Sequence, residues 1–532
     1  TSDVKVGKSV KDMYPKLDKA EARIFTDSPI RHWDEWEDEN YSHLFIMPAD
    51  GGEAIDLMEG EKYDTPMKPF GGSGDIAWSP DSKEIAYTSK KVAEYAKSTD
   101  SDIYIVDIAT RTTREITVGM DGFDMHPLYS PDGKWIAFHS MERPGFEADR
   151  VRLMLFDRKT GNIKELPKNL DQWVDQFVWS PNSDAIYFSS GVQGIVPIFR
   201  LDVATGKWEQ LTKGMYNWDY GLDVTPDGST LVFGKRNMLR PPEYYKYELK
   251  NKRETQLTHA NDDIYEDLAP AEIKEEWITS FDGSQVHCWV LYPPDFRPNK
   301  KYPMITYCQG GPQSMIAHYF SFRWNLYLMA SEGYIVVAPN RRGVPGFGQE
   351  WNDAISGDWA GKPMQDILAA TDEFRKRDYI DTNAIAAVGA SAGGYAAFWL
   401  AGNHEGRFSA FISHCGVFNL ESMYGATEEL WFPNWEYGGP YWKPENKEFY
   451  KKNSPHEFAA NWDTPIMITT GQYDFRVPYT QSLEAYQVAQ VKGIPSKLII
   501  FPEENHWILS LHNALLWQNE FFGFLKTHCK SK

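Results

Sequence analysis

Four stretches in the first half of the chain repeat one another, and this repeat constrains the fold more than any other feature of the sequence. Each stretch joins Ser-Pro or Thr-Pro to a polar turn and an alternating apolar run: WSPDSKEIAYTS from Trp78, YSPDGKWIAFHS from Tyr129, WSPNSDAIYFSS from Trp179 and VTPDGSTLVFGK from Val224. Their Ser or Thr residues fall at 79, 130, 180 and 225, which gives a period of 45 to 51 residues. A fixed period favours a ring or stack of small sheets.

A further pair of strands is predicted after each repeat. The third strands begin at Asp102, Val151, Ile198 and Tyr245, and each continues into a polar turn and a returning strand. Four antiparallel strands per unit are typical of a β-propeller blade. A β-sandwich with similar turns is the alternative, and the fixed period disfavours it.

The number of blades is low for a closed propeller. An earlier partial unit, ARIFTDSP from Ala22 and then HLFIMPADGGEAIDL from His43, brings the count in residues 1–270 to about five. A blade edge left open would expose unpaired backbone groups. We therefore expect the propeller to be incomplete in this chain, and intact mass of the expressed protein tests whether an N-terminal piece is missing.

Residues 271–532 change to strands that alternate with helical segments. Apolar runs predict strands at 304–308, 334–339, 384–389, 408–416, 465–471 and 496–502. This alternation predicts an α/β doubly wound sheet. In such a sheet, active residues are expected at the carboxyl ends of the strands.

Ser391 is the predicted nucleophile, because it is the centre of a G-x-S-x-G motif between an apolar strand and an Ala-rich helix. A strand-turn-helix elbow exposes the hydroxyl, and its crowded backbone requires glycine nearby. Asp474 follows one later strand and His506 follows the last. The order Ser, Asp, His matches a triad in which imidazole is the base and the carboxylate orients it.

An oxyanion intermediate needs two hydrogen-bond donors. One is expected to be the backbone N–H of Ala392, directly after the nucleophile. The other is expected from the turn at Gly310 and Gly311, where missing side chains let the backbone approach a substrate. GVPGFG at 343–348 lacks a following Lys-Ser/Thr and is interpreted as a structural loop.

Composition excludes several other classes of protein. The net charge of −20 argues against nucleic acid as a partner, since phosphate binding needs a basic face. None of the four cysteines falls in a CxxC pair, so we expect no metal and no cofactor. No run of 18 apolar residues is present, and no membrane-spanning helix is expected. The first residues, TSDVKVGKS, contain no signal peptide and no initiator Met, so we expect a processed or cut chain.

These motifs resemble the prolyl oligopeptidase family of serine peptidases. CQGGPQS, NRRGVPGFGQEW, GASAGGY and GQYDFRVPYTQS carry the resemblance, and TEELWFPNWEYGGPYW with HWDEW is most similar to bacterial secreted dipeptidyl peptidases of the V type. The resemblance implies a β-propeller followed by an α/β-hydrolase domain, peptide substrates, and the catalytic roles given above for Ser391, Asp474, His506, Ala392 and Gly311. It also implies a periplasmic or secreted location.

Two positions depart from the family pattern. Gln309 replaces the His that many relatives have before the glycine pair, and Ala392 replaces a larger residue after the serine. The backbone donors survive both changes, but the substrate preference is put in doubt. Family position suggests an apolar pocket made of Val417, Phe418, Met423, Tyr424, Trp431, Phe432 and Val477, each of which could equally be core.

The preferred hypothesis is a serine exopeptidase that releases dipeptides from peptide N-termini through an acyl-enzyme. Such an activity requires an acid that binds the amino terminus, and the candidates are Glu35, Glu37 and Asp38 in the loop 31–45, whose alternative role is a solvated turn. An oligopeptidase or acylaminoacyl peptidase would use the same triad. A binding propeller with an inactive hydrolase domain is the alternative from another class. The sequence does not determine the oligomeric state, and a homodimer is one alternative.

Overall fold

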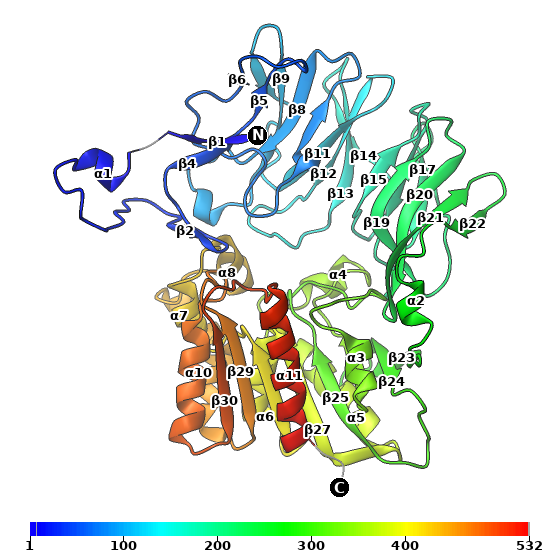
Figure 1. Ribbon diagram of the computed structural model, residues 1–532, viewed down its shortest axis with the longest axis vertical. Helices are drawn as coiled ribbons and strands as arrows, with labels where there is room; N and C mark the ends of the chain where they lie inside the picture. Colours follow the sequence, from blue (N-terminus) through cyan, green and yellow to red (C-terminus); the bar gives the residue numbers. More distant parts are fainter. Residues whose placement is uncertain (7, 530–532) are drawn as a thin grey trace.

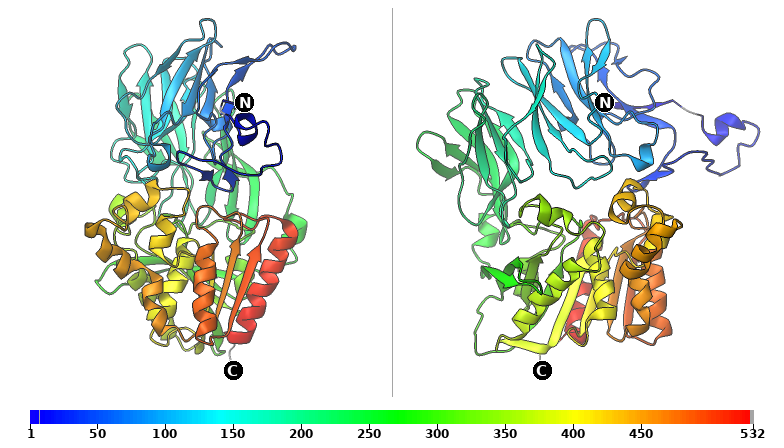
Figure 2. Two further views of the ribbon diagram at one scale, coloured as in Figure 1. Left: turned by 90° about the vertical axis from the view of Figure 1, so that its left-hand side faces the viewer. Right: turned by 180° about the vertical axis from the view of Figure 1, so that it is seen from behind.

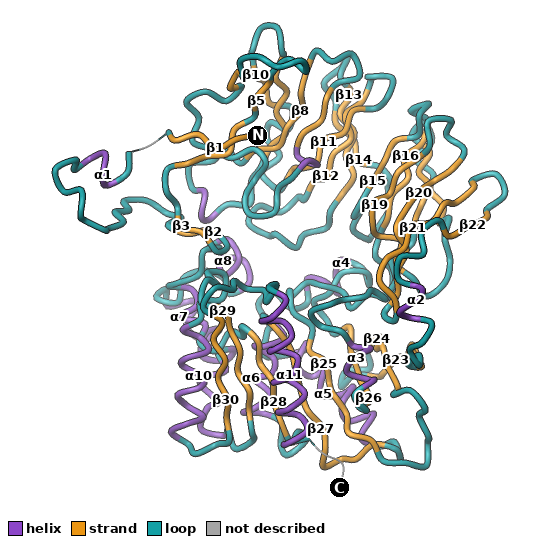
Figure 3. The backbone as a smooth tube through the Cα atoms, in the orientation of Figure 1, coloured by secondary structure: helices purple, strands orange, loops and turns teal. Residues whose placement is uncertain are grey.

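The computed structural model describes residues 1–6 and 8–529. Its first half is a series of antiparallel sheets, which stand side by side in an arc over an α/β domain built from the second half (Figure 1). Figure 2 shows the same two layers from the side and from behind, and Figure 3 shows that helices are concentrated in the lower domain. A propeller-type region and a doubly wound hydrolase domain are therefore both present, which confirms the predicted fold class.

Each repeat unit forms one four-stranded antiparallel sheet, as the sequence predicts. The first sheet contains β7 (Ile76–Trp78), β8 (Glu84–Ser89), β9 (Asp102–Asp107) and β10 (Thr113–Glu115), and the second β11 (Asp124–Tyr129), β12 (Trp135–Ser140), β13 (Arg152–Asp157) and β14 (Ile163–Glu165). The third contains β15 (Phe177–Trp179), β16 (Ala185–Ser189), β17 (Ile198–Asp202) and β18 (Trp208–Gln210), and the fourth β19 (Asn217–Val224), β20 (Thr230–Asn237), β21 (Arg240–Glu248) and β22 (Arg253–Gln256).

The repeated Ser or Thr stabilises the first turn of each blade. The hydroxyl of Ser130 donates to Asp132 (2.8 Å) and accepts from the N–H of Trp135 (3.0 Å), which begins the next strand. Ser180 accepts in the same way from the N–H of Ala185 (2.9 Å). These bonds satisfy turn groups that no strand pairs. The apolar faces of successive sheets then pack on one another, as Ile136 and Phe138 of β12 do against Ile103 and Ile105 of β9.

The described residues of the N-terminal part form short paired strands and one short helix. The structure has β1 (Ser2–Lys5) with β4 (Asn40–His43), β2 (Arg31–His32) with β3 (Glu35–Trp36), β5 (Phe45–Ile46) with β6 (Ile55–Asp56), and the helix α1 (Val10–Met13). The partial fifth unit inferred from the sequence is thus a hairpin, β5–β6, where the other units have four strands. Its side chains pack on the first complete sheet, Leu44 and Leu57 against Tyr87 and Val106.

The second half contains one eight-stranded sheet in the order β23-β24-β26-β25-β27-β28-β29-β30. Its strands are β23 (Glu272–Thr279), β24 (Gln285–Tyr292), β25 (Tyr302–Cys308), β26 (Ile335–Asn340), β27 (Ile380–Ala390), β28 (Ala410–His414), β29 (Ile466–Gly471) and β30 (Ser496–Phe501). From β26 to β30 the neighbours are parallel, whereas β23 and β24 are antiparallel. The carboxyl ends of the parallel strands therefore meet at one edge, which faces the propeller (Figure 1).

Helices cover both faces of this sheet. Apolar side chains of α5 (Lys362–Arg375), α6 (Ala392–Asn403) and α10 (Thr480–Val491) pack in one core cluster, and those of α3 (Leu326–Ser331) and α11 (Leu511–His528) pack in a second. The shorter helices are α2 (Asp262–Tyr265), α4 (Gln349–Asp353), α7 (Leu420–Tyr424), α8 (Trp431–Glu436) and α9 (Lys447–Asn453).

None of the helices in the described ranges is long and apolar enough to cross a membrane.

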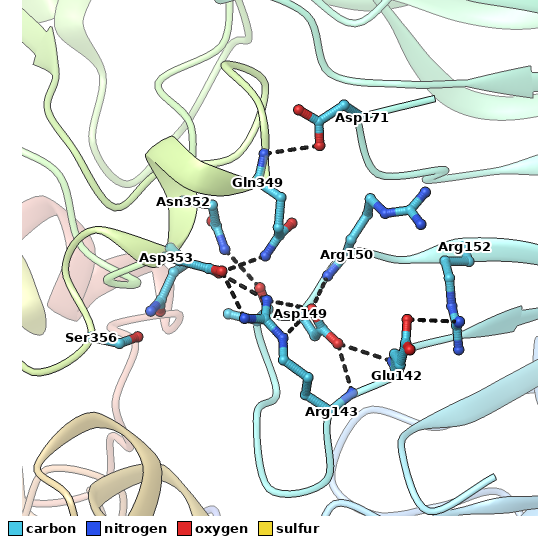
Figure 4. Close-up of polar contacts among 12 residues, drawn as sticks. Glu142, Arg143, Asp149, Arg150, Arg152, Asp171, Gln349, Asn352, Asp353 and Ser356 are labelled. Atoms are coloured by element: carbon cyan, nitrogen blue, oxygen red, sulfur yellow. Dashed lines mark hydrogen bonds and ion pairs between the residues drawn. The ribbon is translucent and has the colours of Figure 1, made fainter. Parts of the chain in front are cut away.

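A charged contact joins the two domains beside α4. Arg143 of the propeller donates to both carboxylate oxygens of Asp353 (2.7 and 2.9 Å) and to Asp149 (2.6 and 2.9 Å) (Figure 4). Asn352 also donates to the carbonyl of Ala148 (2.8 Å). Paired guanidinium–carboxylate bonds fix orientation as well as distance, so this contact sets how the propeller lies over the carboxyl edge of the sheet.

Candidate active site

Ser391 lies at the junction of β27 and α6, in a backbone conformation that few non-glycine residues adopt (φ 58°, ψ −122°). Its N–H donates to the carbonyl of His414 (2.9 Å), and its own carbonyl accepts from the N–H of Tyr395 (2.8 Å). Backbone strain of this kind persists only where the surroundings enforce it, and it concentrates at functional sites. The bonds on both sides hold the side chain of Ser391 at the carboxyl edge of the sheet.

The glycines of the motif are required by close backbone contact. A Cβ atom at Gly389 would lie 2.5 Å from the carbonyl oxygen of Cys308, and one at Gly393 would lie 2.1 Å from it. Both distances are far inside van der Waals contact. The strand β25 can therefore lie against the elbow only because these two positions have no side chain.

Asp474 and His506 form a buried pair at the same edge. Asp474 follows β29, His506 follows β30, and Nδ1 of the histidine lies 2.6 Å from Oδ2 of the carboxylate. The other carboxylate oxygen of Asp474 accepts from the N–H of Val477 (2.8 Å), which fixes its rotamer. Burial alone would lower the pKa of His506, but the charges of Asp474 and Cys415 raise it, and the resulting pKa lies well above that of an ordinary histidine.

The imidazole lies beside a thiol. Its Nε2 lies 3.8 Å from Sγ of Cys415. Among the described residues, the Ser391 hydroxyl makes no hydrogen bond with the imidazole of His506. Ala390 pairs with His414 across the parallel strands, so Ser391 and Cys415 follow at neighbouring strand ends. Catalytic hydrogen bonds are often long before substrate binds. In the proposed mechanism the imidazole of His506 must come within hydrogen-bonding distance of the Ser391 hydroxyl.

Cys415 is a feature that motif reasoning did not identify. It is fully buried and has φ 41°, and its N–H donates to the carbonyl of Thr469 (2.7 Å). Burial raises the pKa of a thiol, but here the imidazoles of His506 and His414 outweigh it and lower the pKa of Cys415 to about 6. In the sequence, Cys415 is an isolated cysteine near the end of the predicted strand 408–416, and no motif marks it as part of the site.

The predicted oxyanion donors lie around Ser391. Ala392 is the first residue of α6, and the first N–H groups of a helix have no intrahelical acceptor. Gly310 touches the nucleophile, since a Cβ there would lie 3.6 Å from Cβ of Ser391. Gly311 has φ 122°, and within the described residues its N–H donates no hydrogen bond. The N–H groups of Ala392 and Gly311 therefore stay the predicted oxyanion donors.

The residues predicted for the substrate pocket are all buried, and they belong to one core cluster: Val417, Phe418, Met423, Tyr424, Trp431, Phe432 and Val477. Trp431 also lines a cavity of about 260 Å³ between the domains, together with His32, Lys90, Glu147 and Arg476. The role of all seven residues in substrate binding stays a prediction.

The acids predicted to bind an amino terminus do not line this cavity, but they line two cavities that adjoin it. Glu35 and Asp38 are exposed, and the adjoining cavities share His32 and Lys68 with the cavity of about 260 Å³. The same loop instead reaches the catalytic pair through Trp33, whose ring centroid lies 5.8 Å from that of His506. The carbonyl of Trp33 accepts from the N–H of Phe475, next to Asp474.

A second group of acids lies closer to the catalytic histidine. Glu428 and Glu429 are buried and pair with Arg476 (3.1 and 2.7 Å), and Glu428 also pairs with His32 (2.9 Å). Burial and the neighbouring carboxylates of Glu147 and Glu428 raise the pKa of Glu429 well above its usual value, against the opposing effect of Arg476. The consecutive acids in TEELW were visible in the sequence, but their burial was not.

A propeller-type domain over an α/β sheet, with serine, histidine and aspartate at the strand ends, defines a serine hydrolase of the propeller-containing class. The model of the prolyl oligopeptidase family matches residues 320–532, and that of the TolB β-propeller domain matches residues 37–286. "Dipeptidyl-peptidase 5" of Porphyromonas gingivalis is 46% identical over 532 residues, which are 99% of this chain and 77% of that protein. This chain belongs to the prolyl oligopeptidase family.

Other relatives and structures agree with this family. "Dipeptidyl-peptidase 5" of Porphyromonas endodontalis is 44% identical over 99% of this chain and 76% of that protein. The structure of the acylaminoacyl peptidase of Pyrococcus horikoshii is similar with a TM-score of 0.79 and 22% identity, over 96% of this chain and 78% of that one. Dipeptidyl peptidase 4 of Porphyromonas gingivalis gives a TM-score of 0.70 at 16% identity, over 92% and 80%. At these identities the structures show a shared fold only.

Proposed function

We propose that this chain is a serine exopeptidase that releases dipeptides from the free N-termini of peptides. The observation that carries the proposal is the convergence of Ser391, Asp474 and His506 at one sheet edge, in a chain 46% identical to a dipeptidyl peptidase. The edge faces the propeller, so a substrate enters between the domains.

The proposed reaction proceeds through an acyl-enzyme. The hydroxyl oxygen of Ser391 attacks the carbonyl carbon after the second substrate residue, and Nε2 of His506 takes the hydroxyl proton. Asp474 stabilises the resulting imidazolium, and the N–H groups of Ala392 and Gly311 donate to the oxyanion. The imidazolium then protonates the leaving amine. Water enters, loses a proton to His506, and releases the dipeptide.

A panel of dipeptide amides with free and acetylated amino groups tests the exopeptidase assignment. We expect cleavage after the second residue for the free substrates, and a loss of at least about 100-fold in kcat/KM when the amino group is acetylated, because an unpaired buried carboxylate costs several kcal/mol. Mass spectrometry of the products gives the cleavage position. Faster cleavage of acetylated substrates would instead identify an acylaminoacyl peptidase.

Glu147 is the carboxylate that we propose for binding the substrate's ammonium group. It is half-buried, lines the cavity of about 260 Å³, and accepts from the indole N–H of Trp431 (2.8 Å), which holds it towards the hydrolase domain. A partly buried carboxylate pairs with an ammonium group more strongly than an exposed one. The acidic net charge of the chain also favours cationic substrates.

Glu147→Gln is expected to raise KM for free-amine dipeptide amides by about 10- to 100-fold with a smaller effect on kcat, because it removes a charge pair that forms on binding. Michaelis–Menten kinetics measure both values. Glu142→Gln, at an exposed glutamate of the same loop, is the matched control and should leave both unchanged. Equal KM values for Glu147→Gln and the wild type would exclude this role.

We also propose that the protein acts outside the cytoplasm, as the resemblance of its motifs to secreted dipeptidyl peptidases implies. Fractionation of cells that express the natural full-length protein tests this proposal. Recovery of the activity with cytoplasmic markers would contradict it.

A further inference from the structure

The turn of the β2–β3 hairpin joins the N-terminal half of the chain to the two loops that contain the catalytic histidine and aspartate. In this hairpin His32 pairs with Glu35, which leaves Trp33 and Asp34 as a two-residue turn. Trp33 has φ 58°, and glycine, asparagine or aspartate usually occupies such a position because a bulky residue is strained there. Strain of this kind persists only where the surroundings hold the residue in place.

The indole of Trp33 packs against the loop of the catalytic base. Its ring centroid lies 5.8 Å from that of His506 and 4.7 Å from that of Trp507, and both pairs are edge-to-face. Phe70, also from the N-terminal half, packs on Trp33 (4.8 Å) and stacks on Trp507 (5.6 Å). Aromatic rings with centroids about 4.5 to 7 Å apart attract one another beyond simple burial. Movement of the imidazole would therefore disturb a packed group of rings.

Arg476 packs on the indole from the loop of the orienting aspartate. Its guanidinium lies 5.0 Å from the ring centroid of Trp33, and it pairs with Glu428 (3.1 Å) and Glu429 (2.7 Å). Both carboxylates are buried, so the pairs fix the position of the guanidinium. The indole of Trp33 thus contacts both catalytic loops.

Hydrogen bonds attach the same turn to these two loops. The side-chain amide of Asn505 donates to Oδ2 of Asp34 (2.7 Å), and the oxygen of that amide accepts from the N–H of Trp507 (2.8 Å). The carbonyl of Trp33 accepts from the N–H of Phe475 (3.2 Å). Asn505 directly precedes the catalytic base and Phe475 directly follows the orienting aspartate. One turn therefore fixes the backbone beside both residues.

We propose that Trp33 and Asp34 are positioning residues that hold His506 beside Asp474 in the arrangement that proton transfer from Ser391 requires. The inference rests on the proposed function, since it concerns the base of that reaction. Displacement of a catalytic group by about 1 Å can lower a rate about a hundredfold. The turn belongs to the N-terminal half of the chain, so the position of the base also depends on how that half lies over the sheet.

Trp33→Gly tests the indole, because glycine adopts the positive φ of the turn without strain and only the side chain is removed. We expect kcat for a free-amine dipeptide amide to fall about 10- to 100-fold, with KM changed less than about threefold, because the base is displaced while the substrate site stays intact. Trp33→Phe keeps an aromatic ring and should restore kcat to within about threefold of the wild type.

Trp78→Ala is the matched control for the indole, because it removes an exposed tryptophan of β7 from the same half of the chain. It should change neither kcat nor KM. A wild-type kcat in Trp33→Gly would overturn the role of Trp33. A rise of KM at constant kcat would also overturn it, since it would assign the indole to substrate binding.

Asp34→Ala removes the acceptor for Asn505, whereas Asp34→Asn keeps an oxygen there and loses only the charge. We expect Asp34→Ala to lower kcat about tenfold and Asp34→Asn to lower it less than about threefold. In an Asn505→Ala background Asp34→Ala should have little further effect, because the bond is already absent. Asp50→Ala, at an exposed aspartate between β5 and β6, should keep the wild-type kinetics. Equal losses in both backgrounds would exclude the proposed role of Asp34.

Hydrogen–deuterium exchange tests the turn independently of activity. Peptides that cover residues 472–477 and 503–509 should exchange faster in Trp33→Gly and Asp34→Ala than in the wild type, because both loops open more often, while exchange in β12 should be unchanged. Unchanged exchange of both loops in both variants would overturn the proposal. If the wild type hydrolysed no peptide, the proposed function would fail, and the exchange rates would still decide whether the turn holds the two loops.

Discussion

Ser391→Ala is expected to lower kcat for a dipeptide amide by about 10⁶-fold while the protein remains folded. The elbow conformation of residue 391 is held by backbone bonds to His414 and Tyr395, which alanine can also make. Only the hydroxyl oxygen is lost, and with it the acyl-enzyme route. The residual rate comes from the oxyanion donors and from substrate positioning. Steady-state kinetics at saturating substrate measure the change.

A matched serine distinguishes loss of the nucleophile from general damage. Ser331 is exposed at the end of α3, away from the carboxyl edge of the sheet. Ser331→Ala should keep the wild-type kcat and react fully with a fluorophosphonate probe, whereas Ser391→Ala should not react. If the Ser391 variant hydrolysed the substrate at near the wild-type rate, the assignment of the nucleophile would be wrong.

Local and periodic signals predicted most of the fold. The turn of each blade depends on a hydroxyl and a carboxylate within five residues of each other, as in Ser130 and Asp132, so it repeats in the sequence wherever the blade repeats. The elbow at Ser391 is local in the same way, because Gly389 and Gly393 flank it. Asp474 and His506 were found because each directly follows a strand, and parallel strands end at one edge.

Features that depend on contacts between distant segments could not be predicted from local sequence patterns. Cys415 lies beside His506 because β27, β28 and the loop after β30 meet, and no spacing in the sequence encodes that contact. The acids of the loop 31–45 suggested either a solvated turn or an acidic binding loop, and neither interpretation includes the contact of Trp33 with His506 or of Asp34 with Asn505. The burial of Glu428 and Glu429 also requires a partner, Arg476, almost fifty residues away.

Asp474→Asn is expected to lower kcat by about 10⁴-fold, because asparagine can hold the imidazole in the wrong tautomer and cannot stabilise its cation. The carboxylate of Asp474 raises the pKa of His506. The base must be neutral to accept a proton, so the wild-type activity should rise with pH through a pKa above that of an ordinary histidine. In Asp474→Asn the imidazolium loses this stabilisation, and the rising limb should shift to lower pH.

Asp463→Asn is the matched control for this change, because Asp463 is an exposed carboxylate that lies 3.5 Å from another histidine, His404. It should leave both kcat and the pH–rate profile unchanged. The two readouts for Asp474→Asn must change together, since one carboxylate both orients the base and sets its pKa. A large loss of kcat with no shift of the limb would mean that the variant has disturbed the structure. A shift without a loss would mean that another group takes the proton of Ser391.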